Sequence, residues 1–176
     1  AGAWTVEWQG VDGNWLPGAM SILDGIEAAR SRGTTIEFEA NAQFDPNKPK
    51  ADLGIAVVGE APYAEGSGDS AEPTLSDEDR ATILRLRATS KHLLVVLVTG
   101  RPLIVTNDIA DWDAAVVAWL PGSEGAGVAD VLFGKKPFTG KLPLPWPATT
   151  AQLPIKDSKS RDGSALLFPR YFGLTH

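Results

Sequence analysis

The chain has 176 residues, of which 43% are hydrophobic and 22% are charged, a composition typical of one globular domain with a sizeable core. Its net charge of −6 disfavours a nucleic-acid or anionic-membrane surface, because such surfaces need a local excess of Lys and Arg. The absence of Cys excludes disulfides, thiol nucleophiles and thiolate metal sites.

The first half of the chain predicts one helix and two strands. Ser21 suits the N-cap of a helix that runs through about Arg32, where apolar residues recur at helical spacing. Residues Thr34 to Ala40 alternate apolar and polar side chains and predict a strand. After a loop, Leu53 to Val58 form a short apolar run that predicts a buried strand.

The middle of the chain predicts a capped helix followed by another buried strand. Ser76 is the expected N-cap, and Ala81, Leu84 and Ala88 share one helical face, which we expect to be buried. Leu93 to Val98 is almost continuously apolar, as in a parallel strand covered on both faces.

The last third predicts two more strands and a helix. Leu103 to Val105 is a candidate short strand, Ala114 to Leu120 is a buried strand, and Gly127 to Phe133 is a helix. Residues 152–165 are polar and are expected to be extended. Alternating strands and helices predict an α/β sandwich with a mostly parallel sheet.

The loop after the 53–58 strand carries the most informative side chains. Glu60, Glu65 and Asp69 lie there among Gly, Pro and Ser, where open α/β sheets usually place ligand-binding groups. Glu65 is a candidate proton donor, since a covered loop can keep a carboxyl group protonated near the working pH. The spacing alone favours a simpler interpretation, in which these residues are solvated loop acids or caps.

Tryptophans form the second group of candidates. Trp4 and Trp8 stand four residues apart and suit stacking on sugar faces, although on spacing alone the simpler interpretation as ordinary core anchors is favoured. Trp112, Trp119 and Trp146 are interpreted as packing residues.

The remaining candidates are weaker. Residues 66–69 lack the spacing of a phosphate-binding glycine loop, and His92, at the entry to a buried strand, is not expected to have a catalytic or metal-binding role. Arg101, between Gly100 and Pro102, suits either of two roles: it clamps a ligand, or it holds its loop through a salt bridge.

Taken in order, these motifs resemble the C-terminal α/β-sandwich domain of family 3 glycoside hydrolases, the β-glucosidases and exo-β-glucanases. The resemblance covers nearly the whole chain. The matching segments are residues 3–10, 58–66 (Val-Gly-Glu-Ala-Pro-Tyr-Ala-Glu-Gly), 98–102 (Val-Thr-Gly-Arg-Pro), 118–125 (Ala-Trp-Leu-Pro-Gly-Ser-Glu-Gly), 130–134, 138–143 and 146–147.

The resemblance implies retaining hydrolysis of β-glucosides, in which a carboxylate attacks the anomeric carbon while a glutamic acid protonates the leaving oxygen. The acid/base glutamate of the family carries over to Glu65. The tryptophan that lines the aglycone-side subsite carries over to Trp8, and Trp4 supports it. Further substrate contacts are expected from three residues, Tyr63, Asp69 and Arg101.

One feature of the family lies outside this chain. Its nucleophilic aspartate belongs to an N-terminal (β/α)8 barrel, and that domain is not found in these residues. From the resemblance to the C-terminal domain, we expect residues 1–176 to be one flavodoxin-like three-layer domain with a mostly parallel sheet of five or six strands. It begins at Ala1 without Met, as expected of a processed, cut or excised chain. A barrel partner and a β-linked gluco-oligosaccharide are expected, with no cofactor, metal, nucleic acid or membrane.

Other functions remain open at this point. Glu60, Asp69 or Glu72 is a candidate nucleophile for a minimal single-domain enzyme. The chain also suits a non-catalytic module that binds glucans through its N-terminal tryptophans. A nucleotide-binding role is disfavoured, because the acidic loop repels phosphate. A secreted or periplasmic location is expected, with a cytoplasmic one as the alternative.

Overall fold

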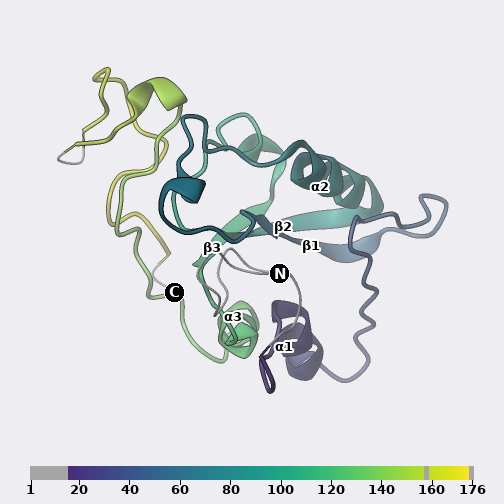
Figure 1. Cartoon of the computed structure of the whole chain (residues 1–176). Coiled ribbons are helices and arrows are strands. Elements are labelled where there is room, and N and C mark those ends of the chain that lie inside the picture. The colour runs from purple at the N-terminus through teal and green to yellow at the C-terminus, as the bar shows by residue number, and fades with distance from the viewer. Residues whose placement is uncertain (1–15, 157–158, 175–176) are drawn as a thin grey trace.

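Three parallel strands form the centre of the structure, a computed structural model that describes residues 16–156 and 159–174 (Figure 1). They are β1 (Ala51–Gly59), β2 (Ser90–Val98) and β3 (Ala114–Trp119), in the spatial order β1-β2-β3. Leu93, Val95 and Val96 of the central strand are fully buried. The continuous apolar pattern of β2 therefore has the expected cause, which is that both faces of the sheet are covered.

The carboxyl ends of the three strands lie level with one another. Gly59 at the end of β1 is opposite Val98 of β2, and Val98 is opposite Trp119 at the end of β3. The loops that follow these strands consequently leave the sheet at one common edge, where parallel sheets place ligand-binding groups.

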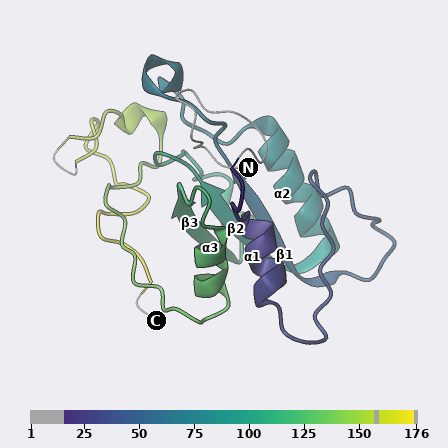
Figure 2. The same cartoon turned by 60° about the horizontal axis from the view of Figure 1, so that its bottom comes forward.

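Helices cover both faces of the sheet and complete three layers (Figures 1 and 2). α1 (Ile22–Ala29) and α3 (Gly125–Leu132) lie together on one face, where Ile22, Ile26 and Ala129 pack against Val96 and Val98. α2 (Asp77–Thr89) covers the other face. The α/β sandwich predicted from the sequence is confirmed.

Both predicted serine caps begin their helices. The Asp24 backbone N–H donates to Ser21 Oγ at 3.1 Å, and the Ser21 N–H donates back to the Asp24 carboxylate at 2.8 Å, which forms a capping box. The Asp79 N–H donates to Ser76 Oγ at 3.0 Å. The first helix ends at Ala29, earlier than the expected end near Arg32.

The segment after α3 packs beside β3 and contains the short helix η3 (Thr150–Gln152). Trp146 anchors this segment: it is 2% exposed, and its indole N–H donates to the Leu103 carbonyl at 2.7 Å. Its backbone N–H donates to the Phe168 carbonyl at 2.8 Å. Trp146, Trp112 and Trp119 all belong to or border the core on the α2 side, as expected of packing residues.

The predicted number of five or six strands is not confirmed, because the described residues contain three. Residues 34–40 alternate as a strand does, but they have no ladder partner in the described chain, and Phe38 is 68% exposed. Residues 103–105 form only an isolated bridge, between Thr74 and Ile104. Alternation describes one strand, whereas a strand of a sheet also needs a neighbour.

The predicted buried face of α2 is also wrong. Ile83 and Leu86 are buried, whereas Leu84 is 63% exposed and Ala88 is exposed. This helix carries apolar side chains on more than one face, so its contacts with the sheet decide which face is buried. Over the described ranges, no helix is long and apolar enough to cross a bilayer.

Candidate active site

The loop after β1 leaves the sheet through a tight contact with β2. A Cβ atom added to Gly59 would overlap the Val98 carbonyl, so the close approach of the two strands requires glycine. The next residue continues the contact, since the Glu60 N–H donates to Val98 O at 3.0 Å. The chain thus leaves β1 at Gly59 in a way that directs Glu60 toward the end of β2.

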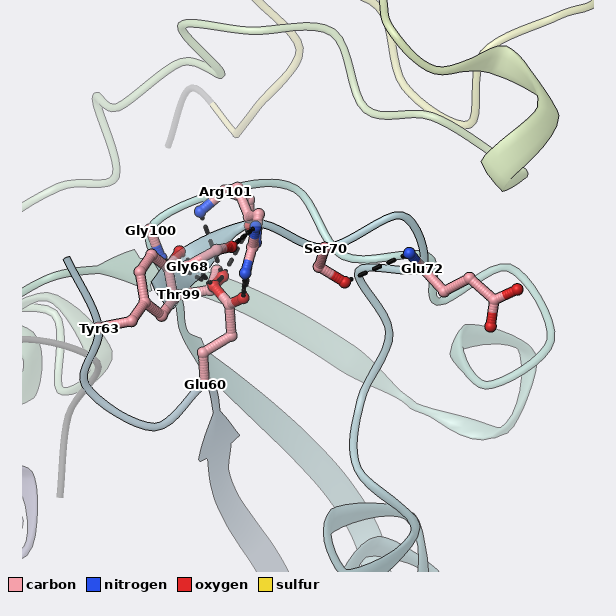
Figure 3. A network of polar contacts seen from close by, with 8 residues as sticks. All are labelled: Glu60, Tyr63, Gly68, Ser70, Glu72, Thr99, Gly100 and Arg101. Carbon is pink, nitrogen blue, oxygen red and sulfur yellow. Dashed lines mark hydrogen bonds and ion pairs between the residues drawn. The ribbon is translucent and has the colours of Figure 1, made fainter. Parts of the chain in front are cut away.

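Glu60 lies at the centre of a polar network (Figure 3). Its Oε2 atom accepts hydrogen bonds from the Tyr63 hydroxyl at 2.9 Å, from the Thr99 hydroxyl at 2.6 Å and from the Gly100 N–H at 3.3 Å. Its Oε1 atom pairs with the guanidinium of Arg101, at 2.7 Å from Nε. The Glu60 side chain is 12% exposed, so these donors replace the water that a free carboxylate would bind.

Arg101 joins this carboxylate to the far end of the same loop. While Nε and Nη2 contact Glu60, Nη1 donates to the carbonyl of Gly68. The guanidinium also lies over the Tyr63 ring, 4.7 Å from its centroid, as in a cation–π contact. Of the two roles open for Arg101, the structure thus contains the salt bridge that holds the loop.

Tyr63 fills the space between two glycines. A Cβ atom added to Gly68 would overlap the Tyr63 ring, and one added to Gly100 would lie 2.8 Å from its hydroxyl oxygen. Burial, and then the hydrogen bond to the Glu60 carboxylate, raise the pKa of the Tyr63 hydroxyl above its ordinary value. Tyr63 therefore stays a neutral donor to Glu60 over the physiological pH range.

Glu65 begins the short 3₁₀ helix η1 (Glu65–Gly68) at the carboxyl edge of the sheet. Its backbone lies in the left-handed region, with φ of 46°, which is uncommon for a residue other than glycine. The side chain is exposed, and it makes no hydrogen bond or ion pair with any described residue. Glu60 and Glu65, which looked alike in the sequence, thus differ: the Glu60 side chain is largely covered and paired, whereas the Glu65 side chain is exposed.

The other predicted site residues are placed as follows. Asp69 directly follows η1 and is exposed, and its N–H donates to the Gly66 carbonyl at 3.1 Å. Glu72 points away from the network, with its N–H donating to Ser70 Oγ at 3.2 Å (Figure 3). Trp4 and Trp8, with Trp15, lie outside the described residues.

Thr99 and Gly100 are the members of the network that sequence reasoning missed. Thr99 is fully buried, and its hydroxyl contacts both Glu60 and the Arg101 carbonyl. A signal was available, because both residues directly follow a predicted parallel strand next to the one that ends before Glu60. Adjacent parallel strands bring such residues together at one edge.

In the described part of the chain, no cluster of His, Asp and Glu suits a metal ion, and His92 is exposed.

A mainly apolar cavity of about 710 Å³ runs along β3, α3 and the C-terminal segment, with Trp119, Trp146, Phe138 and Phe172 in its wall. None of residues 60–69 lines this cavity.

Comparison with known proteins bears on the whole chain. Residues 1–176 match a family model described as the glycosyl hydrolase family 3 C-terminal domain. Over 168 residues the chain is 34% identical to a protein named periplasmic beta-glucosidase from Salmonella typhimurium, in an alignment covering 81% of this chain and 22% of that protein. A lysosomal beta glucosidase from Dictyostelium discoideum is 29% identical over 171 residues, covering 88% and 21%.

A solved structure agrees with these matches at the level of the fold. It is a beta-glucosidase from Listeria innocua in complex with isofagomine, with a TM-score of 0.64 and 24% identity. The match covers 83% of this chain and 22% of that one. The chain spans about a fifth of the length of these relatives.

Proposed function

This chain belongs to the C-terminal domains of family 3 glycosyl hydrolases, as its sequence motifs predicted, and from this premise we propose that it supplies the acid/base glutamate of a retaining β-glucosidase. In this proposal, Glu65 protonates the leaving oxygen when the glycosidic bond breaks. It then deprotonates the water that releases glucose from the enzyme. The substrate is a β-linked gluco-oligosaccharide, cleaved at its non-reducing end.

The observation that carries the proposal is the exposed carboxyl group of Glu65 at the carboxyl edge of the sheet, which has no partner in the part of the chain that the structure describes. A general acid/base must reach its substrate and exchange a proton in each half-reaction. A carboxylate already paired with a cation is unsuited to that task, and Glu60 is paired with Arg101. Of these two glutamates on the loop, Glu65 is therefore the better candidate.

We propose that the attacking carboxylate comes from a barrel domain outside this chain. A retaining site needs two carboxyl groups about 5–5.5 Å apart. Glu60 is a poor nucleophile, because Tyr63, Thr99 and the rest of its network occupy both of its oxygens. On this basis the isolated 176-residue chain has little hydrolytic activity.

Contacts to the substrate complete the proposal. Trp8 lines the aglycone side with support from Trp4, and Asp69 lies beside the turn that presents Glu65. Tyr63 and Arg101 were also expected to contact the substrate; both bond to Glu60, which favours a role in holding the loop. A periplasmic or otherwise secreted location is supported by the names of two relatives, one periplasmic and one lysosomal.

The test is Glu65→Gln in the complete polypeptide that contains this domain. We expect kcat/KM for cellobiose to fall about 10²- to 10⁴-fold, the usual contribution of a positioned acid or base. Hydrolysis of 2,4-dinitrophenyl β-glucoside should keep its kcat/KM, because that leaving group departs without a proton. Its kcat should fall and should be restored by azide, which attacks the glycosyl intermediate without help from a base.

The matched control is Glu72→Gln, the same change at an exposed glutamate of the same connection. This change should leave kcat/KM unchanged for both cellobiose and 2,4-dinitrophenyl β-glucoside. Near-normal turnover of cellobiose by the Glu65→Gln enzyme would reject the assignment. Labelling with a 2-fluoro-glucoside then locates the nucleophile, and a labelled carboxylate within these 176 residues would reject the barrel proposal.

A further inference from the structure

We propose that Glu60, Tyr63 and Arg101 are positioning residues, which hold the Glu65–Gly68 turn and so determine where the Glu65 carboxyl group lies. This inference rests on the proposed acid/base role of Glu65. It assigns to the polar network of Figure 3 a function in catalysis without direct contact between the network and the reacting atoms.

The turn is held on both sides of Glu65. Two residues before it, the Tyr63 hydroxyl donates to Glu60 at 2.9 Å. Three residues after it, the Gly68 carbonyl accepts from Arg101 Nη1. Arg101 and Glu60 are themselves joined at 2.7 Å, so the two sides of the turn are connected through one ion pair.

Packing limits the turn as well as hydrogen bonding. The Tyr63 ring lies between Gly68, where an added Cβ would overlap it, and Gly100, where one would approach its hydroxyl to 2.8 Å. The Arg101 guanidinium lies over the ring. The start and the end of the loop therefore share a single, closely packed side chain.

The network is fixed to the most buried part of the sheet. Thr99, which directly follows β2, has no exposed surface, and its hydroxyl donates to Glu60 at 2.6 Å. The Thr99 N–H in turn donates to the Trp119 carbonyl at the end of β3. These hydrogen bonds therefore anchor the loop at the ends of β2 and β3.

Glu65 needs this external support because its own side chain has no partner among the described residues. Its direction depends on the backbone, which is held at φ of 46°, a conformation that persists only when its surroundings impose it. A shift of about 1 Å in a reacting group can cost about 10²-fold in rate. Loosening the network should therefore weaken proton transfer while leaving sugar binding intact.

The experiment compares two arginines in the complete polypeptide. Arg101→Lys keeps the charge beside Glu60, but a single ammonium cannot reproduce the planar fork that joins Glu60 to Gly68. The matched control is Arg80→Lys. Arg80 is similarly exposed, at 33% against 28%, and it also joins a carboxylate, Asp108 at 2.9 Å, to a backbone carbonyl, that of Leu75.

The readout is kcat/KM for cellobiose, which needs the acid, and for 2,4-dinitrophenyl β-glucoside, which does not. We expect Arg101→Lys to lower kcat/KM for cellobiose at least about tenfold, which is within the rate loss that a displaced reacting group can cause. The same change should alter kcat/KM for 2,4-dinitrophenyl β-glucoside less than about twofold. Arg80→Lys should leave the ratio of the two values unchanged. Tyr63→Phe, which keeps the ring and removes the donor to Glu60, should change the ratio in the same direction.

Several outcomes would overturn the inference. Equal losses on both substrates would indicate that Arg101 binds the sugar or only stabilises the fold. An equal change of the ratio in Arg80→Lys would show a global effect. If Arg101→Lys does not fold, an unchanged ratio in Tyr63→Phe rejects the proposal. The Glu65→Gln enzyme separates the two hypotheses: if it shows the leaving-group dependence and the network variants do not, only the positioning role fails.

Discussion

Gly25 of α1 lies in direct backbone contact with Gly125 at the start of α3. A Cβ atom added to Gly25 would come within 2.7 Å of the Gly125 carbonyl oxygen, and one added to Gly125 would overlap the backbone of Ser21. The Gly125 N–H also donates to the Met20 carbonyl at 3.0 Å. Because both residues lack a side chain, the two helices approach closely enough to share one face of the sheet.

We expect Gly125→Ala to destabilise the 176-residue chain by about 1–3 kcal/mol, as overpacking does in closely packed sites. Gly127→Ala is the control within the same helix, since an added Cβ there meets nothing within 4 Å. That change should stabilise by up to about 1 kcal/mol, because alanine favours the helix. Urea unfolding followed by circular dichroism measures both, and equal effects would contradict the close contact.

The buried face of α2 can be tested with two leucines. Leu86→Ala should cost about 2–5 kcal/mol, since Leu86 is 9% exposed and its removal leaves a cavity. Leu84→Ala, at 63% exposure, should change the free energy of unfolding by less than about 0.5 kcal/mol. If Leu84→Ala has the larger effect, the face that the sequence pattern suggested is the buried one.

Ser90 and Ser76 should respond in opposite directions to the same substitution. Ser90 is 2% exposed, and its hydroxyl has no hydrogen-bond partner among the described residues. Ser90→Ala removes this unsatisfied group, and we expect a gain of about 1 kcal/mol in unfolding free energy. Ser76→Ala removes the N-cap of α2 and should lose about 1 kcal/mol. Thermal unfolding of both variants gives the signs, and a loss in Ser90→Ala would indicate a partner for its hydroxyl.

The ionisation of Tyr63 provides a pH test of the polar network. Burial and the bond to Glu60 raise the pKa of its hydroxyl, so tyrosinate should form above the ordinary value of about 10. In a Tyr171→Phe chain, Tyr63 is the one remaining tyrosine, and its absorbance can be titrated directly. Glu60→Gln should lower the midpoint. A titration midpoint at or below about 10 in the Tyr171→Phe chain would contradict a buried Tyr63 hydroxyl bonded to Glu60.

The sign of the accompanying stability change follows from linkage. Because the pKa of Tyr63 is raised in the folded chain, its contribution to stability is fully present below the ordinary pKa of about 10. That contribution is lost as the pH rises through the folded value. The free energy of unfolding should therefore fall more steeply in this range for the Tyr171→Phe chain than for a chain that also carries Tyr63→Phe.

Local patterns predicted most of the regular elements. The run from Leu93 to Val98 indicated a covered parallel strand, and Ser21 and Ser76 indicated helix starts, because strand burial and capping depend on residues close in sequence. Residues 34–40 show where such patterns stop being sufficient. They have the alternation of a strand, but pairing depends on a neighbouring strand that their own sequence cannot specify.

The candidate site divides in the same way. The sequence by itself determined the family, through ordered motifs along nearly the whole chain, and it identified Glu65 as the residue to consider for proton transfer. Apart from the resemblance, residue type and spacing could not distinguish Glu65 from Glu60, because both are loop acids among small residues. The tertiary structure supplied the physical distinction, by bringing Thr99 and Arg101 from the end of β2 against the Glu60 carboxylate and leaving Glu65 without a partner among the described residues. The physical reason is that burial and ion pairing depend on residues about forty positions apart, which the parallel sheet brings to a common edge.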